Sequence, residues 1–176
     1  MTDDESLQAA IHEIVAVHAP DPAWPALFVA ERERLTTQLP GAFIDIQHIG
    51  STAVAGLAAK PIIDILAGVA PPVNGHPFVR APRRYGYIDG AEVGSRVLDH
   101  RWFMRWSAGR RTHHLHVVEH GSAAWRQRLR FRDALRADPA LAARYAALKQ
   151  ALAARYARNR NAYTEGKAAF IASICQ

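Results

Sequence analysis

The feature that most constrains the fold is an apolar run that contains a single carboxylate. Residues 61–69 read PIIDILAGV, in which Asp64 is the only charged residue. A short apolar run rich in isoleucine is typical of a buried central strand. Because an unpaired buried carboxylate is costly, an Asp in such a strand is more often part of a site than a packing residue. The run therefore predicts a central strand with a functional Asp64.

A second strand, ending in a glycine-serine turn, precedes this one. Residues 43–49 alternate as a half-buried strand does, and Gly50, Ser51 and Thr52 then break the pattern. Glycine lets the backbone approach a phosphate closely, and a serine hydroxyl with neighbouring N–H groups can bond its oxygens. Lys60 would add a point charge just before the Asp64 strand. Taken alone, a Gly-Ser pair is more often a plain turn.

Caps, prolines and hydrophobic periodicity divide the rest of the chain. They predict strands over residues 14–17, 43–49 and 61–69, a hairpin of 96–106 and 112–119, and helices over 22–39, 78–85, 123–136, 139–157 and 161–174. This order predicts an α/β (α+β) class, in which a mixed sheet is flanked by helices and followed by a helical C-terminal tail. We expect a single domain over residues 1–176.

Two histidines share one face of the strand over residues 112–119. His114 and His116 point one way by alternation, and Leu115 points the other. Two imidazoles beside Asp64 would serve as metal ligands, proton donors or neutral phosphate binders. Such a pair also occurs where histidines only hydrogen-bond within a polar sheet face. Both interpretations stay open.

The chain is basic, with a net charge of +6, but its basic residues are almost all arginine. Lysine occurs only at Lys60, Lys149 and Lys167, and the other 19 of the 22 basic residues are arginine. A position that keeps lysine calls for a compact ammonium on a flexible stem, which makes Lys60 and Lys167 candidates for a site. A basic balance suits nucleotides, phosphometabolites or RNA. No RNA-binding motif is present, so nucleic acid ranks last.

The sequence excludes or disfavours a targeting segment, a membrane span, an intramolecular disulfide and a thiolate zinc cluster. The acidic residues at the start of the chain have the wrong charge for a targeting segment. The most apolar stretch, residues 54–73, is interrupted by Lys60 and Asp64, so it does not read as a membrane span. Cys175 is the only cysteine, which rules out an intramolecular disulfide and a thiolate zinc cluster. We expect a cytoplasmic protein without membrane contact, and the oligomeric state stays open.

Four segments resemble the GrpB family, also called the UPF0157 family. They are HIGSTAVAGLAAKPIIDI (48–65), THHLHVVE (112–119), FRDALR (131–136) and AYTEGKAAFI (162–171), and the resemblance runs from about Ala16 to the end. It implies a nucleotidyltransferase-like fold, and members also occur fused to dephospho-CoA kinase. Active enzymes of that superfamily carry Asp-x-Asp on this strand and a third carboxylate on a later one. Here Leu66 stands in place of the second Asp, which puts ordinary two-metal chemistry in doubt.

The motifs and the resemblance together predict one site. Its catalytic and metal-binding residues would be Asp64, His114 and His116, and its phosphate- or ligand-binding residues would be His48, Gly50, Ser51, Thr52, Lys60, Arg132, Tyr163 and Lys167. Tyr163 and Lys167 share a helix face at a spacing of four. Arg132 would bind a substrate phosphate or pair with an acid. The cofactor would be a divalent cation, Mg²⁺, Mn²⁺ or a transition metal.

Three functions follow as hypotheses. The first is transfer of a nucleotidyl or phosphoryl group to a small acceptor. The alternative is a degenerate relative that binds a nucleotide or CoA-like metabolite without chemistry, which the residue at position 66 favours. The third is an RNA-binding module built on the arginine-rich helix that follows Ser122. The expected partner is a nucleotide or another phosphorylated small molecule.

Overall fold

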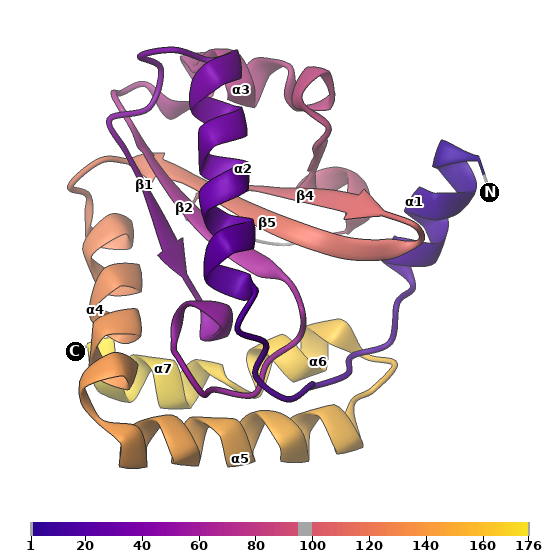
Figure 1. Cartoon of the computed structure of the whole chain (residues 1–176), viewed down its shortest axis with the longest axis vertical. Coiled ribbons are helices and arrows are strands. Elements are labelled where there is room, and N and C mark those ends of the chain that lie inside the picture. The colour runs from indigo at the N-terminus through magenta and orange to yellow at the C-terminus, as the bar shows by residue number, and fades with distance from the viewer. Residues whose placement is uncertain (1, 95–99, 176) are drawn as a thin grey trace.

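The computed structural model describes residues 2–94 and 100–175, and it contains one mixed five-stranded sheet (Figure 1). The strands are β1 (Asp45–Ile49), β2 (Ile63–Val69), β3 (Ile88–Asp89), β4 (Arg101–Ser107) and β5 (Arg110–Glu119). They lie in the order β1-β2-β5-β4-β3. β2 and β5 run parallel, and the other neighbours are antiparallel. The predicted mixed sheet is confirmed.

Helices cover both faces of this sheet and one of its ends. They are α1 (Asp3–Ile11), α2 (Trp24–Gln38), α3 (Pro77–Arg80), α4 (Ala123–Ala137), α5 (Pro139–Arg155), α6 (Arg160–Glu165) and α7 (Ala168–Cys175). In Figure 1, α2 crosses the sheet in front, while α5 runs along the bottom with α6 and α7 above it. The predicted helical tail is therefore present as α4 to α7. No helix in the two described ranges is long and apolar enough to cross a membrane.

The main core lies between the sheet and α2. Alternate residues of β2, starting with Ile63 and Ile65, are fully buried against Trp24, Phe28 and Leu35 of α2. The first and third of these helix residues are one and two turns from Phe28, so they form one apolar stripe. Because side chains alternate along a strand, the other residues of β2 must face the opposite side.

The opposite face is covered in parts. Trp125 of α4 packs on Leu66 and Ile49 at one edge, and α1 packs through Leu7 on Met104 and Ile88 at the other. The C-terminal helices form a third apolar cluster, in which α4 and α5 pack on the segment that carries Val54 and Leu57. Between these clusters the sheet presents Asp64 and its histidine neighbours. The fold thus leaves a polar strip enclosed by helices.

Several predicted element boundaries were wrong. Residues 14–17 do not form a strand, although His18 makes an isolated bridge with Ala59. The predicted helix over 78–85 is two short turns, because Ala81 precedes Pro82 and a residue before proline avoids the helical region. Helix α2 begins at Trp24 rather than Pro22. The first part of the predicted 96–106 strand, residues 96–99, lies outside the described residues, and the remainder is β4.

The last predicted helix, over residues 161–174, is divided in two. Helix α6 ends at Glu165 and α7 begins at Ala168, so Lys167 lies in the break. A Cβ added to Gly166 would lie 2.5 Å from a methyl carbon of Leu152, which shows how closely this break approaches α5. Helix α1 and the short strand β3 were not predicted at all.

Candidate functional site

The centre of the candidate site is a pair of side chains from adjacent parallel strands. Asp64 of β2 lies opposite His114 of β5, and Leu66 lies opposite His116. Because neighbouring residues in register share a face, Asp64, His114 and His116 all point to the strip between the helices. The distance from Asp64 Oδ1 to His114 Nδ1 is 3.1 Å, and that to His116 Nε2 is 3.9 Å. The sequence correctly predicted that these three residues lie together.

The carboxyl of Asp64 is held ionised by its neighbours. Burial alone would raise its pKa, but the bonds from His114 and His116 outweigh this and keep the pKa of Asp64 well below its usual value. Burial lowers the pKa of His114 to about 3, so its ring is neutral at pH 7. Because Asp64 is ionised and can only accept, His114 carries its proton on Nδ1 and donates it in the hydrogen bond to Asp64, so Nε2 is left as an acceptor. This buried Nε2 has no hydrogen-bond partner among residues 2–94 and 100–175.

The Gly50-Ser51 turn lies directly against Asp64. Gly50 has φ 70° and ψ −170°, a conformation that is essentially restricted to glycine. A Cβ at this position would lie 2.4 Å from Asp64 Oδ2, so a side chain would collide with the carboxylate. Ser51 then begins a single 3₁₀ turn, and its Oγ accepts a hydrogen bond of 2.8 Å from Lys149 Nζ. The turn therefore packs its glycine against the carboxylate and places the next hydroxyl on Lys149.

All three lysines of the chain gather at this turn, and we call Lys60, Lys149 and Lys167 the lysine cluster. The ammonium groups of Lys60 and Lys167 lie 5.1 and 4.7 Å from the ring centre of the buried Tyr163. Lys149 Nζ lies 4.9 Å from the ring centre of Tyr145. Cations over aromatic faces are attracted by the ring quadrupole. The rings therefore hold the three ammonium groups in place.

The cluster is buried enough to destabilise its own charges. Burial and, to a smaller extent, the charge of Lys167 lower the pKa of Lys149 to about 7, although the charge of Asp64 acts in the opposite direction. Burial also lowers the pKa of Lys60 well below its usual value, helped by Lys167 and Arg160. The pKa of Lys167 is lowered by burial too. Each ammonium is thus short of compensating negative charge.

Arg160, at the start of α6, adds a fourth cation with unused donors. Its Nη2 donates to the backbone oxygen of Glu13 over 3.0 Å. Its Nε and Nη1 atoms are buried and have no hydrogen-bond partner in the described part of the chain. Buried donors in native proteins are normally paired with protein groups or with ordered water, so both atoms have the capacity to donate to a further acceptor.

A chain of side chains connects His116 to α4. His100 Nε2 and His116 Nδ1 are 2.7 Å apart, and Arg128 Nη2 donates to His100 Nδ1 over 2.7 Å. Arginine has only donors, so the His100 nitrogen facing it must accept. His100 Nε2–H then donates to His116, whose Nε2 is left to face Asp64. The chain orients His116 toward the carboxylate.

Three residues predicted for the site lie elsewhere. His48 pairs in register with Ile65, so it faces α2, where it stacks on Phe28 with ring centres 4.7 Å apart. Thr52 Oγ1 bonds His48 Nε2 over 3.0 Å and donates to a backbone oxygen. Arg132 donates to Gln47 Oε1, the backbone oxygen of His48 and Asp133. All three hold the β1 turn and α4 in place.

The predicted metal ligands lie together without forming a preformed metal centre. Within the described ranges, no group of three or more His, Cys, Asp or Glu side chains is arranged to hold an ion. The Asp64 oxygen nearest the histidines is already bonded to His114. Leu66, at the place of the second carboxylate, is fully buried under Trp125. Cations surround the remaining carboxylate, which is the opposite of what a divalent ion prefers.

Sequence reasoning missed Lys149, Arg160, Tyr145 and His100. The signal for Lys149 was present, because it is one of only three lysines. Its helix gave no further indication, since the side chain's place depends on how α5 packs below the sheet. Arg160 is one of 19 arginines and has no distinguishing pattern in the sequence.

Comparison with known proteins places this arrangement in a family. The model of the GrpB family, described as "GrpB protein", matches residues 14–176. A UPF0157 protein of Pseudomonas aeruginosa is 40% identical over 98% of this chain and 71% of its own length. The glutamate-rich protein GrpB of Alkalihalophilus pseudofirmus is 36% identical over 86% of this chain and 88% of its own. A UPF0157 protein of Bacillus subtilis is 40% identical, but the chain spans only 41% of its length.

A solved structure agrees with these relatives. The crystal structure of conserved protein GrpB from Enterococcus faecalis has a TM-score of 0.77 and 34% sequence identity, over 91% of this chain and 94% of that one. The likeness therefore extends over most of the fold of both chains. The chain belongs to the GrpB family, also called UPF0157.

Proposed function

We propose that this protein binds a phosphorylated small molecule, of the nucleotide or CoA-like class, with its phosphate against the lysine cluster. One observation carries the proposal: the only three lysines in a chain of 176 residues meet beside Ser51 and Asp64. Arginine supplies the positive charge elsewhere. Compact ammonium groups at one place fit the oxygens of a phosphate.

The electrostatics of the cluster support an anionic ligand. Lys149 is buried, Lys60, Lys167 and Arg160 are half-buried, and the charge of Asp64 raises the pKa of each of the three lysines. Like charges held together in a partly buried site repel more strongly than in water, because the effective dielectric constant there is lower. A phosphate dianion would reverse this repulsion and pair the unused donors of Arg160. The isolated cluster is therefore prepared for a ligand with two negative charges.

Transfer of a phosphoryl or nucleotidyl group is the second candidate. It is favoured by the carboxylate and the neutral His114, which stand 3.1 Å apart next to the proposed phosphate position. A neutral imidazole beside an ionised carboxylate can relay a proton. The nucleotidyltransferase-like relationship rests on the family resemblance. A divalent cation on Asp64, His114 and His116 belongs to this candidate and stays a prediction.

The first test is a thermal-shift screen with nucleotides, CoA esters and sugar phosphates. A ligand at 100 times its Kd stabilises the folded protein by about 2.7 kcal/mol, which raises Tm by roughly 5–10 °C in a chain of this size. Lys149→Met should abolish the shift. Arg144→Met is the matched control, because Arg144 is an exposed residue of the same helix. If no phosphorylated compound shifts the wild-type Tm, binding is disproved.

The second test separates binding from transfer. A bound nucleoside triphosphate is incubated with Mg²⁺ or Mn²⁺ and small acceptors, and pyrophosphate or modified acceptor is measured. Turnover that Asp64→Asn removes supports transfer. Binding without turnover across the acceptors supports the non-catalytic alternative. A Tm shift by Mn²⁺ or Zn²⁺ alone that disappears in His114→Ala would support metal binding, and its absence would count against it.

A further inference from the structure

Lys149 and Ser51 form a close pair whose two members differ in exposure. The distance from Lys149 Nζ to Ser51 Oγ is 2.8 Å. Lys149 is 2% exposed, while Ser51 is half-buried. Lysine that only attracts a ligand from solvent is normally exposed at its ammonium. Here Ser51 is partly exposed to solvent, whereas the side chain of Lys149 is enclosed.

The other neighbours of Lys149 fix the direction of its nitrogen. Its Nζ donates to the backbone oxygen of Ala58 and lies over the ring of Tyr145. A neutral amine in this position gives one hydrogen to Ala58 and turns its lone pair toward the hydroxyl of Ser51. A base that is oriented by a third group next to a hydroxyl is the arrangement of activated serine nucleophiles, including the Ser-Lys variants.

We propose that Ser51 is a nucleophile, with Lys149 as its general base, that accepts a phosphoryl group from a phosphoric ester or anhydride. The inference rests on the proposed function, because it names the chemistry of the ligand bound there. Ser51 Oγ forms a bond to phosphorus while the bond from phosphorus to the leaving oxygen breaks. The proton of the hydroxyl passes to Lys149 Nζ. The leaving group departs with the electron pair and takes a proton from solvent, to which Lys149 later returns its own.

The surroundings suit this step. Gly50 places Ser51 at the end of β1, on a sharp turn against Asp64 that only glycine permits. Lys60 and Lys167, both held at the ring of Tyr163, would face the phosphoryl oxygens. A positively charged surround favours phosphorus over an uncharged acyl carbon, because the phosphoryl group carries its negative charge throughout the reaction. The substrate class is therefore a phosphoryl donor.

The test uses a fluorophosphonate probe on the full chain, with the modified residue located by mass spectrometry. We expect one adduct, on Ser51, formed as fluoride leaves. Ser51→Ala should remove it, and Ser173→Ala, which alters an exposed serine of α7, should leave it unchanged. Lys149→Arg keeps the charge but cannot act as a base, so labelling should slow by about 10²- to 10⁴-fold. An equal rate in Lys149→Arg overturns the proposal.

The pH dependence of Ser51 labelling in the wild-type protein tests the proposal even if Lys149→Arg does not fold. The charged groups that act on Lys149 are Lys167 and Asp64, and the pKa of Lys149 is about 7. Labelling of Ser51 should then rise about 10-fold between pH 6 and pH 8 and level off above that. A rate that keeps rising to pH 10, or no adduct on Ser51, overturns the proposal. Phosphorylated ligands that still raise Tm in that case would leave the proposed function standing.

Discussion

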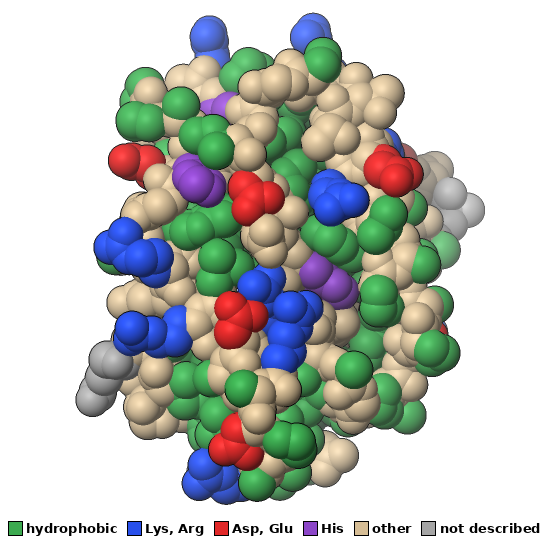
Figure 2. Space-filling view, turned by 60° about the vertical axis from the view of Figure 1, so that its left-hand side comes forward, with side chains coloured by type: hydrophobic (Ala, Val, Ile, Leu, Met, Phe, Trp, Pro, Cys, Tyr) green, Lys and Arg blue, Asp and Glu red, His purple; other side chains and the backbone are tan. Residues whose placement is uncertain are grey.

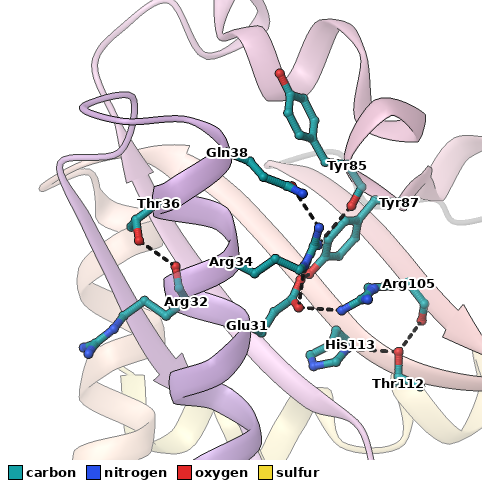
Figure 3. Close-up of polar contacts among 10 residues, drawn as sticks. All are labelled: Glu31, Arg32, Arg34, Thr36, Gln38, Tyr85, Tyr87, Arg105, Thr112 and His113. Atoms are coloured by element: carbon teal, nitrogen blue, oxygen red, sulfur yellow. Dashed lines mark hydrogen bonds and ion pairs between the residues drawn. The ribbon is translucent and has the colours of Figure 1, made fainter.

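Glu31 is the most completely bonded carboxylate on the α2 face of the sheet. It is 3% exposed, and both its oxygens accept hydrogen bonds: from Arg34 at 2.6 and 2.9 Å, from Tyr87 at 2.8 Å and from Arg105 at 2.5 Å (Figure 3). Burial would raise its pKa, but the bonds from Arg34 and Tyr87 outweigh this and lower it. The network ties α2 to β4 and to the segment before β3.

Replacing Glu31 by Gln should therefore destabilise the fold by about 3 kcal/mol, because Arg34 and Arg105 would be left unpaired but partly hydrated. Urea unfolding at pH 7 measures the loss. Since the folded pKa of Glu31 is depressed, the wild-type advantage should be full above its unfolded pKa and shrink as the pH falls below 4. Glu33→Gln, on the exposed side of the same helix, should change stability by less than about 0.5 kcal/mol. A loss in Glu33→Gln equal to that in Glu31→Gln would contradict this explanation.

Gly50 allows a second test at a single residue. Gly50→Ala should cost about 1–3 kcal/mol of backbone strain and also displace the Asp64 carboxylate, so it should abolish ligand binding. Gly56→Ala is the matched control, because Gly56 has φ 75° and nothing within 4 Å of an added Cβ. It should be strained but still bind. Equal binding by the two variants, measured as ligand-induced Tm shift, would show that the contact of Gly50 with Asp64 is unimportant.

At the scale of elements, strand alternation predicted the centre of the site and packing decided the rest. Asp64, His114 and His116 were found because side-chain direction along a strand is a local property. Alternation alone did not decide whether His48 or Ile49 shares the face of Ile46, and the prediction of His48 as a ligand-binding residue was wrong, because its register with Ile65 turns it toward α2. The positions of Lys149 and Arg160 depend on how α5 and α6 pack below the sheet, which no local pattern encodes.

Arg132 shows how an element-level contact can resemble a ligand-binding residue. Its bonds to Gln47 and to the backbone of His48 fasten α4 to β1. Arg132→Met should destabilise the fold by about 1–3 kcal/mol, since the buried backbone oxygen of His48 and the half-buried side chain of Gln47 lose their donor. The Kd of the ligand for the folded variant, measured by calorimetry, should stay within twofold of the wild-type value. A loss of binding larger than 10-fold, without unfolding, would return Arg132 to the site.

At the scale of the whole molecule, the arginines are spread along the chain, whereas the three lysines form one cluster. On the face in Figure 2, Lys and Arg side chains lie interspersed with acidic and apolar ones. Several arginines of the described chain are paired with carboxylates, as Arg132 is with Asp133 at 2.7 Å and Arg34 is with Glu31 at 2.6 Å. The lysine cluster, in contrast, has Asp64 as the carboxylate acting on all of its members. The net charge of +6 is therefore a poor guide to function, and the unbalanced charge at one site is a better one.

This imbalance predicts an unusual pH dependence of stability. The folded pKa of Lys149 is about 7, against a reference value of 10.5. Between these values the unfolded chain binds more protons than the folded one, so the free energy of unfolding should rise with pH from 7 to 10. The slope is at most about 1.4 kcal/mol per pH unit for one such lysine. The lowered pKa values of Lys60 and Lys167 act in the same direction.

Ligand binding should have the opposite slope. A bound phosphate raises the pKa of Lys149, which moves the neutral base form to higher pH without removing it, so the affinity should fall as pH rises above 7 while the free protein becomes more stable. Urea unfolding at pH 7, 8 and 9, with and without ligand, measures both trends. In Lys149→Met both slopes should decrease, whereas Arg144→Met should keep them because Arg144 is exposed. Unchanged slopes in Lys149→Met would mean that another group titrates. They would contradict the proposal that the ligand compensates the charge of the lysine cluster.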